Sequence, residues 1–221
     1  MVVGVARGHN KVVLLNEQQQ NGERWIVLED PGADGFFEGG PATGRDREQV
    51  FGGSGVSYLS GRLSPTGRFA AYILYYGGQQ INASVYDMGR GGNVTQGTVV
   101  NLPLPTLPPF PQGTSTQPIL RWIDVDEEGT GSGEVAVLGE AVAAGGTPNG
   151  SPYWFIVHYR VGSDDRFGTS DDITTLTMFP RQYSDFVDGL SLRGGVVVLS
   201  GSIAAATPAV LYNRFYSCRL P

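Results

Sequence analysis

The stretch Ser64-Pro-Thr-Gly-Arg-Phe-Ala-Ala-Tyr72 decides the fold class, because it joins a turn to a strand without a polar face. Pro65 and Gly67 are typical turn residues, and the run from Phe69 to Tyr72 has no charged or amide side chain. A short apolar run that follows turn residues predicts a strand buried on both faces. The chain should therefore contain a sheet that is covered on each side by other elements.

Three further segments repeat this pattern, about 60 residues apart, at Gly8–Leu15, Gly131–Leu138 and Arg193–Leu199. Each apolar strand is followed by a strand richer in aromatic residues, at 24–28, 82–86, 153–159 and 209–216. The first three units add a weaker third strand, at 48–51, 97–101 and 173–179. Such a repeat predicts an all-β chain, either a β-propeller of about four blades or part of a larger propeller.

The fourth unit shows two strands where a blade needs four. Three alternatives remain open at this point. The segment from Met1 to Ala6 closes the ring, or the chain is a piece of a larger propeller, or a second copy completes it.

A proline-rich connector separates blades 1 and 2, at 1–101, from blades 3 and 4, at 119–221. It occupies 102–118, and Leu102 to Gln112 holds five prolines in eleven residues. Prolines at this density predict a polyproline-type segment without strand hydrogen bonds. It is either a stiff crossover within one domain or a docking peptide for a proline-binding partner. Two small β-sandwich domains, one on each side, are the alternative fold.

Composition excludes some functions. The net charge is −6 with no basic cluster, so nucleic acid is not an expected partner. No apolar run reaches the roughly 18 residues of a membrane span, and Met1 to Arg7 does not form a signal peptide. His9 and His158 have no metal-ligand spacing, and there is no nucleophile elbow or phosphate loop. A non-enzymatic protein is therefore expected.

Two motifs resemble known families. Ser64 to Arg68 resembles the Ser-Pro-Asp-Gly-Arg turn that opens blades of TolB-like (PD40) propellers, with Thr66 in place of Asp. The segment 161–172 resembles the Gly-x-Asp-Gly-x-Phe-Gly-Thr-x-Asp-Asp loops of secreted, myxobacterial-type repeat proteins, with Asp165 in place of Gly. The second resemblance implies a bacterial protein that is extracellular or resides in the cell envelope, as a mature or trimmed fragment.

Acidic loops suggest calcium, which prefers six to eight oxygen ligands from carboxylates and carbonyls of a tight loop. The segment 161–172 offers Asp164, Asp165, Asp171 and Asp172, and the segment 29–37 offers Asp30 and Asp34. A third acidic stretch, 124–129, begins like a calcium loop but has Val135 where the last ligand belongs. The alternative for each is a solvated turn in which Asp side chains cap backbone amides.

The expected function is an extracellular or envelope scaffold that binds a protein or glycan partner through a rigid surface with calcium-stabilised loops. A second hypothesis makes the chain a structural subunit of a surface assembly, a homo-oligomer in which a neighbouring chain completes the last blade. A third hypothesis is a hydrolase or lyase that uses paired carboxylates across a propeller funnel.

Overall fold

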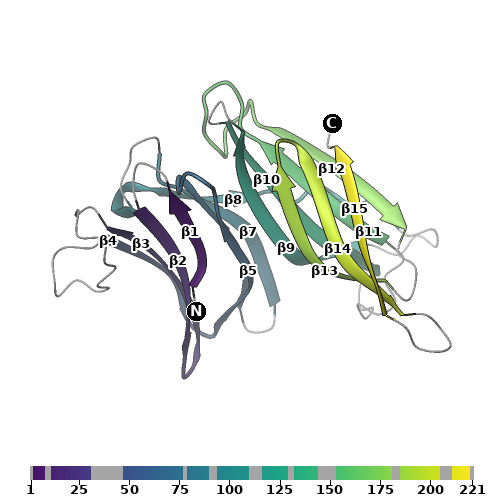
Figure 1. Ribbon diagram of the computed structural model, residues 1–221, viewed down its shortest axis with the longest axis horizontal. Helices are drawn as coiled ribbons and strands as arrows, with labels where there is room; N and C mark the ends of the chain where they lie inside the picture. Colours follow the sequence, from purple (N-terminus) through teal and green to yellow (C-terminus); the bar gives the residue numbers. More distant parts are fainter. Residues whose placement is uncertain are drawn as a thin grey trace.

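A computed structural model describes four antiparallel sheets that follow one another along the chain (Figure 1). It describes residues 2–7, 11–30, 47–76, 79–89, 94–109, 116–128, 132–143, 153–180, 185–204 and 211–219. The first sheet contains β1 (Val2–Arg7), β2 (Lys11–Gln19), β3 (Gly22–Asp30) and β4 (Arg47–Ser54). The second contains β5 (Val56–Leu63), β6 (Phe69–Tyr76), β7 (Gln79–Asp87) and β8 (Thr98–Leu102).

The third sheet contains β9 (Thr116–Glu128), β10 (Ser132–Ala143), β11 (Tyr153–Arg160) and β12 (Ile173–Pro180). The fourth has three described strands, β13 (Asp185–Arg193), β14 (Val196–Ala204) and β15 (Leu211–Arg219). A short 3-10 turn, η1 (Val94–Gln96), precedes β8. Strands in every sheet pair in chain order, so each sheet is a simple meander, as in a propeller blade. In the described ranges no helix is long and apolar enough to cross a membrane.

The sheets stand side by side in chain order. Their first strands are neighbours in space, β1 with β5, β5 with β9 and β9 with β13. Within the part of the chain that the structure describes, extended contacts join only consecutive sheets, so the four sheets form an open arc (Figure 1). The all-β, propeller-type fold class expected from the repeat is confirmed.

Each sheet begins with a strand that the predicted set did not contain. The apolar runs form the second strand of each sheet, and this first strand precedes each of them. The segment from Met1 to Ala6 does not complete the last sheet either, because β1 pairs with β2 at the edge of the first sheet. Polar residues hid the first strand of the third sheet, because β9 carries Asp124 and Asp126, which are typical of a loop.

A β-bulge recurs at the same place in all four first strands. One residue is skipped in the pairing with the second strand, at Val3, Leu59, Arg121 and Asp188. A bulge bends its strand and increases the local twist. Four matching bulges show that the sheets repeat one structural unit more closely than the sequence does.

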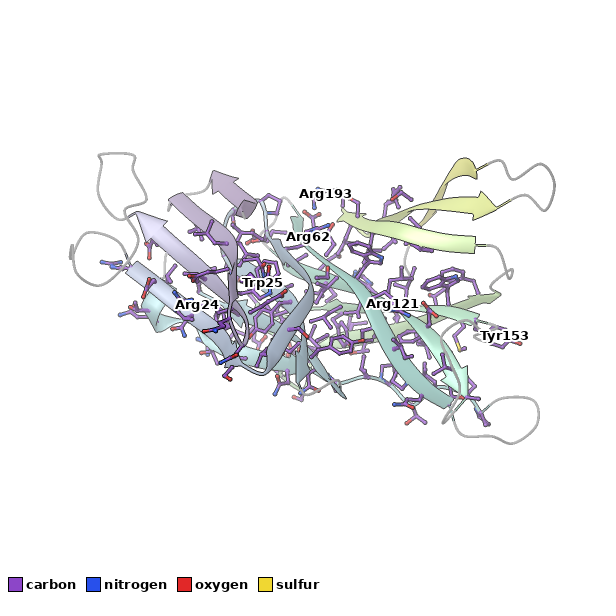
Figure 2. All side chains as sticks on the ribbon, turned by 90° about the horizontal axis from the view of Figure 1, so that it is seen from below. Arg24, Trp25, Arg62, Arg121, Tyr153 and Arg193 are labelled. Carbon is purple, nitrogen blue, oxygen red and sulfur yellow. The ribbon has the colours of Figure 1, made fainter. Side chains whose placement is uncertain are left out.

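The largest hydrophobic core lies between the second and third sheets. It combines Phe69, Ile73 and Val85 with Ile123 and Phe155. The connector therefore does not separate two independent sandwiches, because the halves that it joins share this core. A second core joins the first two sheets, and Trp25 fills it closely: a Cβ on Gly61 of β5 would lie 2.5 Å from the indole ring (Figure 2).

Candidate calcium loop and its inter-sheet joint

The loop between β11 and β12, residues 161–172, carries the acidic cluster expected from the sequence. Gly168 adopts φ +85° and Asp165 adopts φ 59°, both in the left-handed region. Asp165 stands where the related loops have Gly, which adopts this region without strain, whereas Asp does so at a modest cost.

Three carboxylates converge in this loop. Asp164, Asp171 and Asp172 each offer an oxygen, and these oxygens lie within 4.8 Å of one another. Asp164 and Asp171 are exposed, and Asp172 is half-buried. Hard oxygen ligands at this separation suit Ca²⁺, and neighbouring backbone carbonyls and water would have to supply the rest of its coordination.

The Thr169 hydroxyl lies among these carboxylates. Its Oγ1 is 2.8 Å from Oδ1 of Asp171, 3.3 Å from Oδ1 of Asp164 and 3.4 Å from Oδ1 of Asp172. One hydroxyl proton can be donated to only one of these oxygens at a time. A cation at this point would offset the repulsion among the remaining oxygens.

Hydrogen bonds fix the Asp171 and Asp172 carboxylates. Asp171 accepts from the Ser163 backbone N–H at 2.7 Å and from the Ser163 hydroxyl at 2.9 Å. Asp172 accepts from the Gly168 N–H at 2.6 Å and the Gly162 N–H at 3.2 Å. The hydroxyls of Thr169 and Ser163 lower the pKa of Asp171 to about 2, so its carboxylate is charged at neutral pH.

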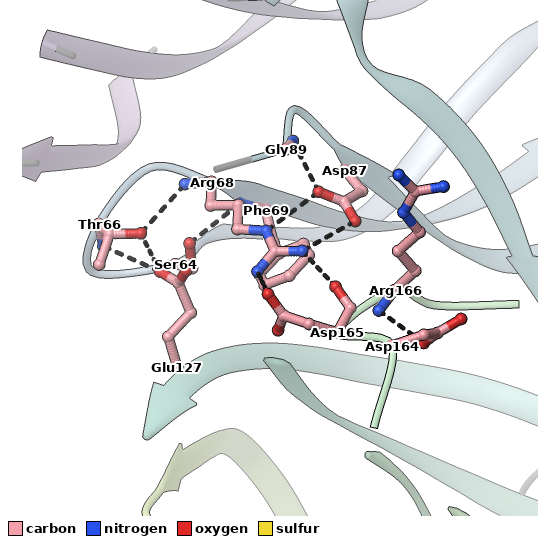
Figure 3. A network of polar contacts seen from close by, with 10 residues as sticks. All are labelled: Ser64, Thr66, Arg68, Phe69, Asp87, Gly89, Glu127, Asp164, Asp165 and Arg166. Carbon is pink, nitrogen blue, oxygen red and sulfur yellow. Dashed lines mark hydrogen bonds and ion pairs between the residues drawn. The ribbon is translucent and has the colours of Figure 1, made fainter. Parts of the chain in front are cut away.

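Asp165 does not join the cluster, which corrects the expected set of four ligands in this loop. Its Oδ2 accepts a hydrogen bond from Nη1 of Arg68 at 2.7 Å, and its backbone carbonyl accepts from Nη2 of Arg68 (Figure 3). Arg68 is 8% exposed and also pairs with Asp87, at 3.2 and 3.3 Å. The loop is thereby tied to the second sheet by a nearly buried guanidinium.

Aromatic packing reinforces this joint. The rings of Phe69 and Phe167 meet edge to face with centroids 5.2 Å apart, and the Arg68 guanidinium lies 4.4 Å from the centre of the Phe69 ring. Gly133 of β10 faces both rings, since a Cβ there would lie 2.7 Å from Phe69 and 2.8 Å from Phe167. The two motifs that carried the family resemblances thus form one contact between sheets.

The turn that precedes β6 is held in the same joint. The Ser64 hydroxyl accepts from the Phe69 N–H at 3.0 Å, and Glu127 of β9 accepts from the Thr66 N–H at 3.1 Å and from the Thr66 hydroxyl (Figure 3). The sequence did not predict the roles of Arg68, Asp87 and Glu127. The sequence feature that could have suggested this contact is a pair of similar triplets, Gly-Arg-Phe at 67–69 and Arg-Phe-Gly at 166–168.

In the third acidic stretch, residues 124–128 belong to β9, so neither a calcium loop nor a solvated turn describes them. Asp124 and Asp126 lie on β9, each 5% exposed. They accept hydrogen bonds from the backbone N–H of Leu192 and Gly194, both at 2.8 Å. Burial raises the pKa of Asp124, against the opposing effect of the Leu192 and Val125 amides. These carboxylates fasten the fourth sheet to the third.

Glu134 and His158 lie in the same inter-sheet contact. Glu134 accepts from the Gly195 N–H at 3.0 Å, and Nε2 of His158 lies 3.5 Å from its carboxylate. The neighbouring His158 imidazole lowers the pKa of Glu134. His158 is 4% exposed. It is therefore a buried residue of β11 that faces Glu134.

The first acidic loop contributes little to the site as described. Asp34 and the side chain of Asp30 lie outside the described residues, so the calcium hypothesis for 29–37 stays a prediction. The preceding residue, Glu29, is 2% exposed and accepts a hydrogen bond from the Val94 N–H of η1 at 2.8 Å. It joins the first sheet to the second.

Comparisons with known proteins assign no family. No family model matches the chain, and no curated protein matches it. Among solved structures, the β-propeller domain of Cps50 (Swd1) from Myceliophteria thermophila is similar, with 10% identity, 97% of this chain and 85% of that chain covered, and a TM-score of 0.25. A similarity at this level establishes no shared family or function. Membership in the TolB-like family is thus unsupported by any match.

Proposed function

We propose that the chain is a non-catalytic scaffold of the extracellular space or the cell envelope, in which Ca²⁺ stabilises the loop 161–172. The observation that carries the proposal is the convergence of Asp164, Asp171 and Asp172 around Thr169, in a loop that also clamps two sheets together. A cation there would strengthen a joint of the scaffold without taking part in chemistry. Calcium concentrations outside cells favour such loops, which supports the location.

A protein partner is favoured over a glycan. Glycan recognition commonly uses exposed aromatic rings, whereas the exposed large hydrophobic residues in the described part of the chain are Val99, Ile173 and Val198. Buried carboxylates also support a structural role. Asp124, Asp126 and Glu134 accept hydrogen bonds from backbone amides of the next sheet, which is a poor arrangement for the two free acids that a glycosidase needs.

A thermal melt with excess CaCl₂ and with chelator tests the calcium proposal. Saturation at roughly 100 times Kd should add about 2.7 kcal/mol, which raises Tm by roughly 5–10 °C for a chain of this size. Asp164→Asn combined with Asp171→Asn should abolish that rise, because both carboxylates belong to the cluster and neither is buried.

Asp165→Asn is the matched control for this melt. It removes a carboxylate from the same loop, but one that pairs with Arg68 and lies outside the cluster. The variant should lower Tm in chelator and retain the calcium-dependent rise. An unchanged Tm of the parent chain in saturating calcium contradicts the proposal, and a rise that survives the double substitution places calcium elsewhere.

A second function is favoured by one observation, the exposure of Val198. In β6 and β10 the core residues of the apolar run are buried on both faces, whereas Val198 of β14 is 36% exposed on the outward face of the last sheet. An exposed apolar side chain on the last sheet fits a structural subunit whose fourth sheet packs against a second copy of the chain.

A further inference from the structure

The connector between the second and third sheets is anchored to the core by its leucines. Leu102 and Leu107 are 3% and 8% exposed, and Leu104 packs against the same core cluster. The Tyr159 hydroxyl donates a hydrogen bond to the Pro103 carbonyl at 2.8 Å. Residues 103–109 belong to no strand. The segment is therefore fixed in position by side chains while its backbone stays outside the sheets.

The two leucines that pack against the core lie three residues apart in this segment. Leu104 and Leu107 face the core, whereas Pro103, Thr106 and Pro109, also spaced by three, are exposed. Three residues per turn is the period of the polyproline II helix, in which residues i and i+3 form one ridge. The leucine ridge thus faces inward, and two ridges rich in proline face outward.

The third ridge carries Pro105 and Pro108. Pro105 is half-buried and Pro108 is exposed, and together they bound a Pro-x-x-Pro segment whose two prolines lie one turn apart. Domains that recognise polyproline II segments receive such prolines in grooves lined by aromatic residues. The usual entropic cost of ordering the ligand is small here, because the core already holds the segment in place.

We propose that residues 103–109 are a preformed polyproline II ligand for a partner domain with an aromatic-lined groove. No residue from Leu102 to Gln112 is charged, and the Pro103 and Pro108 carbonyls already accept hydrogen bonds from Tyr159 and Thr116. Recognition therefore rests on proline rings. The partner groove needs no acidic or basic counterpart, and the affinity should be nearly independent of salt. The sequence analysis gave two alternatives for the connector, a stiff crossover and a docking peptide. In this arrangement the same segment can serve as both.

NMR titration of isolated SH3 and WW domains with the unlabelled full chain tests the proposal. The domains used are those that bind poly-L-proline, and their groove resonances report contact. At least one of these domains should show saturable chemical-shift changes in its groove, and free poly-L-proline should reverse them. NaCl at about 0.5 M, which screens surface charges, should leave the shifts unchanged. Pro105→Ala combined with Pro108→Ala should weaken the binding by on the order of tenfold.

Pro65→Ala is the matched control, because Pro65 is an exposed proline outside the connector, in the turn before β6. It should leave the binding unchanged, and a melt of the double variant should show an intact fold. The proposal is overturned if none of the domains that bind poly-L-proline shifts at millimolar chain. It is equally overturned if binding survives the double substitution or falls equally with Pro65→Ala.

Discussion

At the scale of single residues, the acidic loop shows how hydroxyl groups control a carboxylate. Asp171 is exposed, yet the hydroxyls of Thr169 and Ser163 hold its pKa near 2. Exposure alone would leave this carboxyl near its ordinary value. The charge of the loop therefore persists to a lower pH than its solvent exposure suggests.

The Asp171 carboxyl carbon should titrate in calcium-free buffer with a midpoint of about 2, as measured by ¹³C NMR. Because the folded pKa lies below the ordinary value of 3.8, its contribution to stability is present above pH 4, and is lost as pH falls toward 2. Thr169→Val should raise the midpoint, since the largest cause of the shift is removed.

Thr174→Val is the control for this titration, because it makes the same substitution at an exposed threonine of the neighbouring strand β12. It should leave the midpoint of Asp171 unchanged. A parent midpoint near 3.8 would show that the hydroxyl contacts do not persist in solution.

At the scale of elements, Arg68 is the central contact between the β5–β6 turn and the β11–β12 loop. Arg68→Met should reduce the free energy of unfolding by about 3 kcal/mol, because it keeps the side-chain stem and leaves Asp87 and Asp165 without their partner. Arg68→Lys should lose less, since it retains the charge without the forked geometry. Urea denaturation measures both.

Arg24→Met provides the comparison for that experiment. Arg24 pairs with Glu17 across two strands, but its side chain is 35% exposed and that of Glu17 is 44% exposed. Exposed pairs contribute about 0–1 kcal/mol. If Arg68→Met costs no more than Arg24→Met, the buried clamp does not hold the two sheets together.

Some elements could be predicted from the sequence and others could not, for a physical reason. Strands such as β6 and β10 were predicted because burial on both faces requires a continuous apolar run. First strands such as β9 were missed because their charged residues are satisfied by amides of the next sheet. Contacts between segments far apart in the chain, such as Arg68 with Asp165, could not be predicted because they produce no periodic pattern in the local sequence.

The candidate site was predicted in part for the same reason. Asp164, Asp171 and Asp172 belong to one short loop, so sequence spacing alone placed them together. Asp165 sits between them in the chain, but its backbone is in the left-handed region and its side chain pairs with Arg68. A resemblance that has Gly at this position could not reveal that contact.

At the scale of the whole molecule, Val198 is the exposed large hydrophobic residue on the described part of the fourth sheet. If a second copy packs there, the solution mass measured by light scattering should be a multiple of 23.6 kDa. Val198→Glu should then reduce it to that of one chain, because a charge would be buried in the contact. A mass of one chain for the parent protein would contradict the assembly hypothesis.

Val99→Glu is the control, since Val99 is also exposed, at 48%, but lies on β8 of the second sheet. It should leave the mass of the parent assembly unchanged. A mass that falls with both variants would indicate a general effect of added charge and not a specific interface.

The contacts between consecutive sheets also determine how the molecule should respond to a pulling force. In a closed ring, a pull on the two ends is opposed by every blade at once. Here, in the described part of the molecule, each sheet is held only by the one before it and the one after it. Tension applied across the molecule would load the joints in series, so the weakest joint would part first while the other sheets stayed folded. Arg68 with its carboxylate partners and the hydrophobic core between the second and third sheets would together set the force at which the middle of the arc gives way.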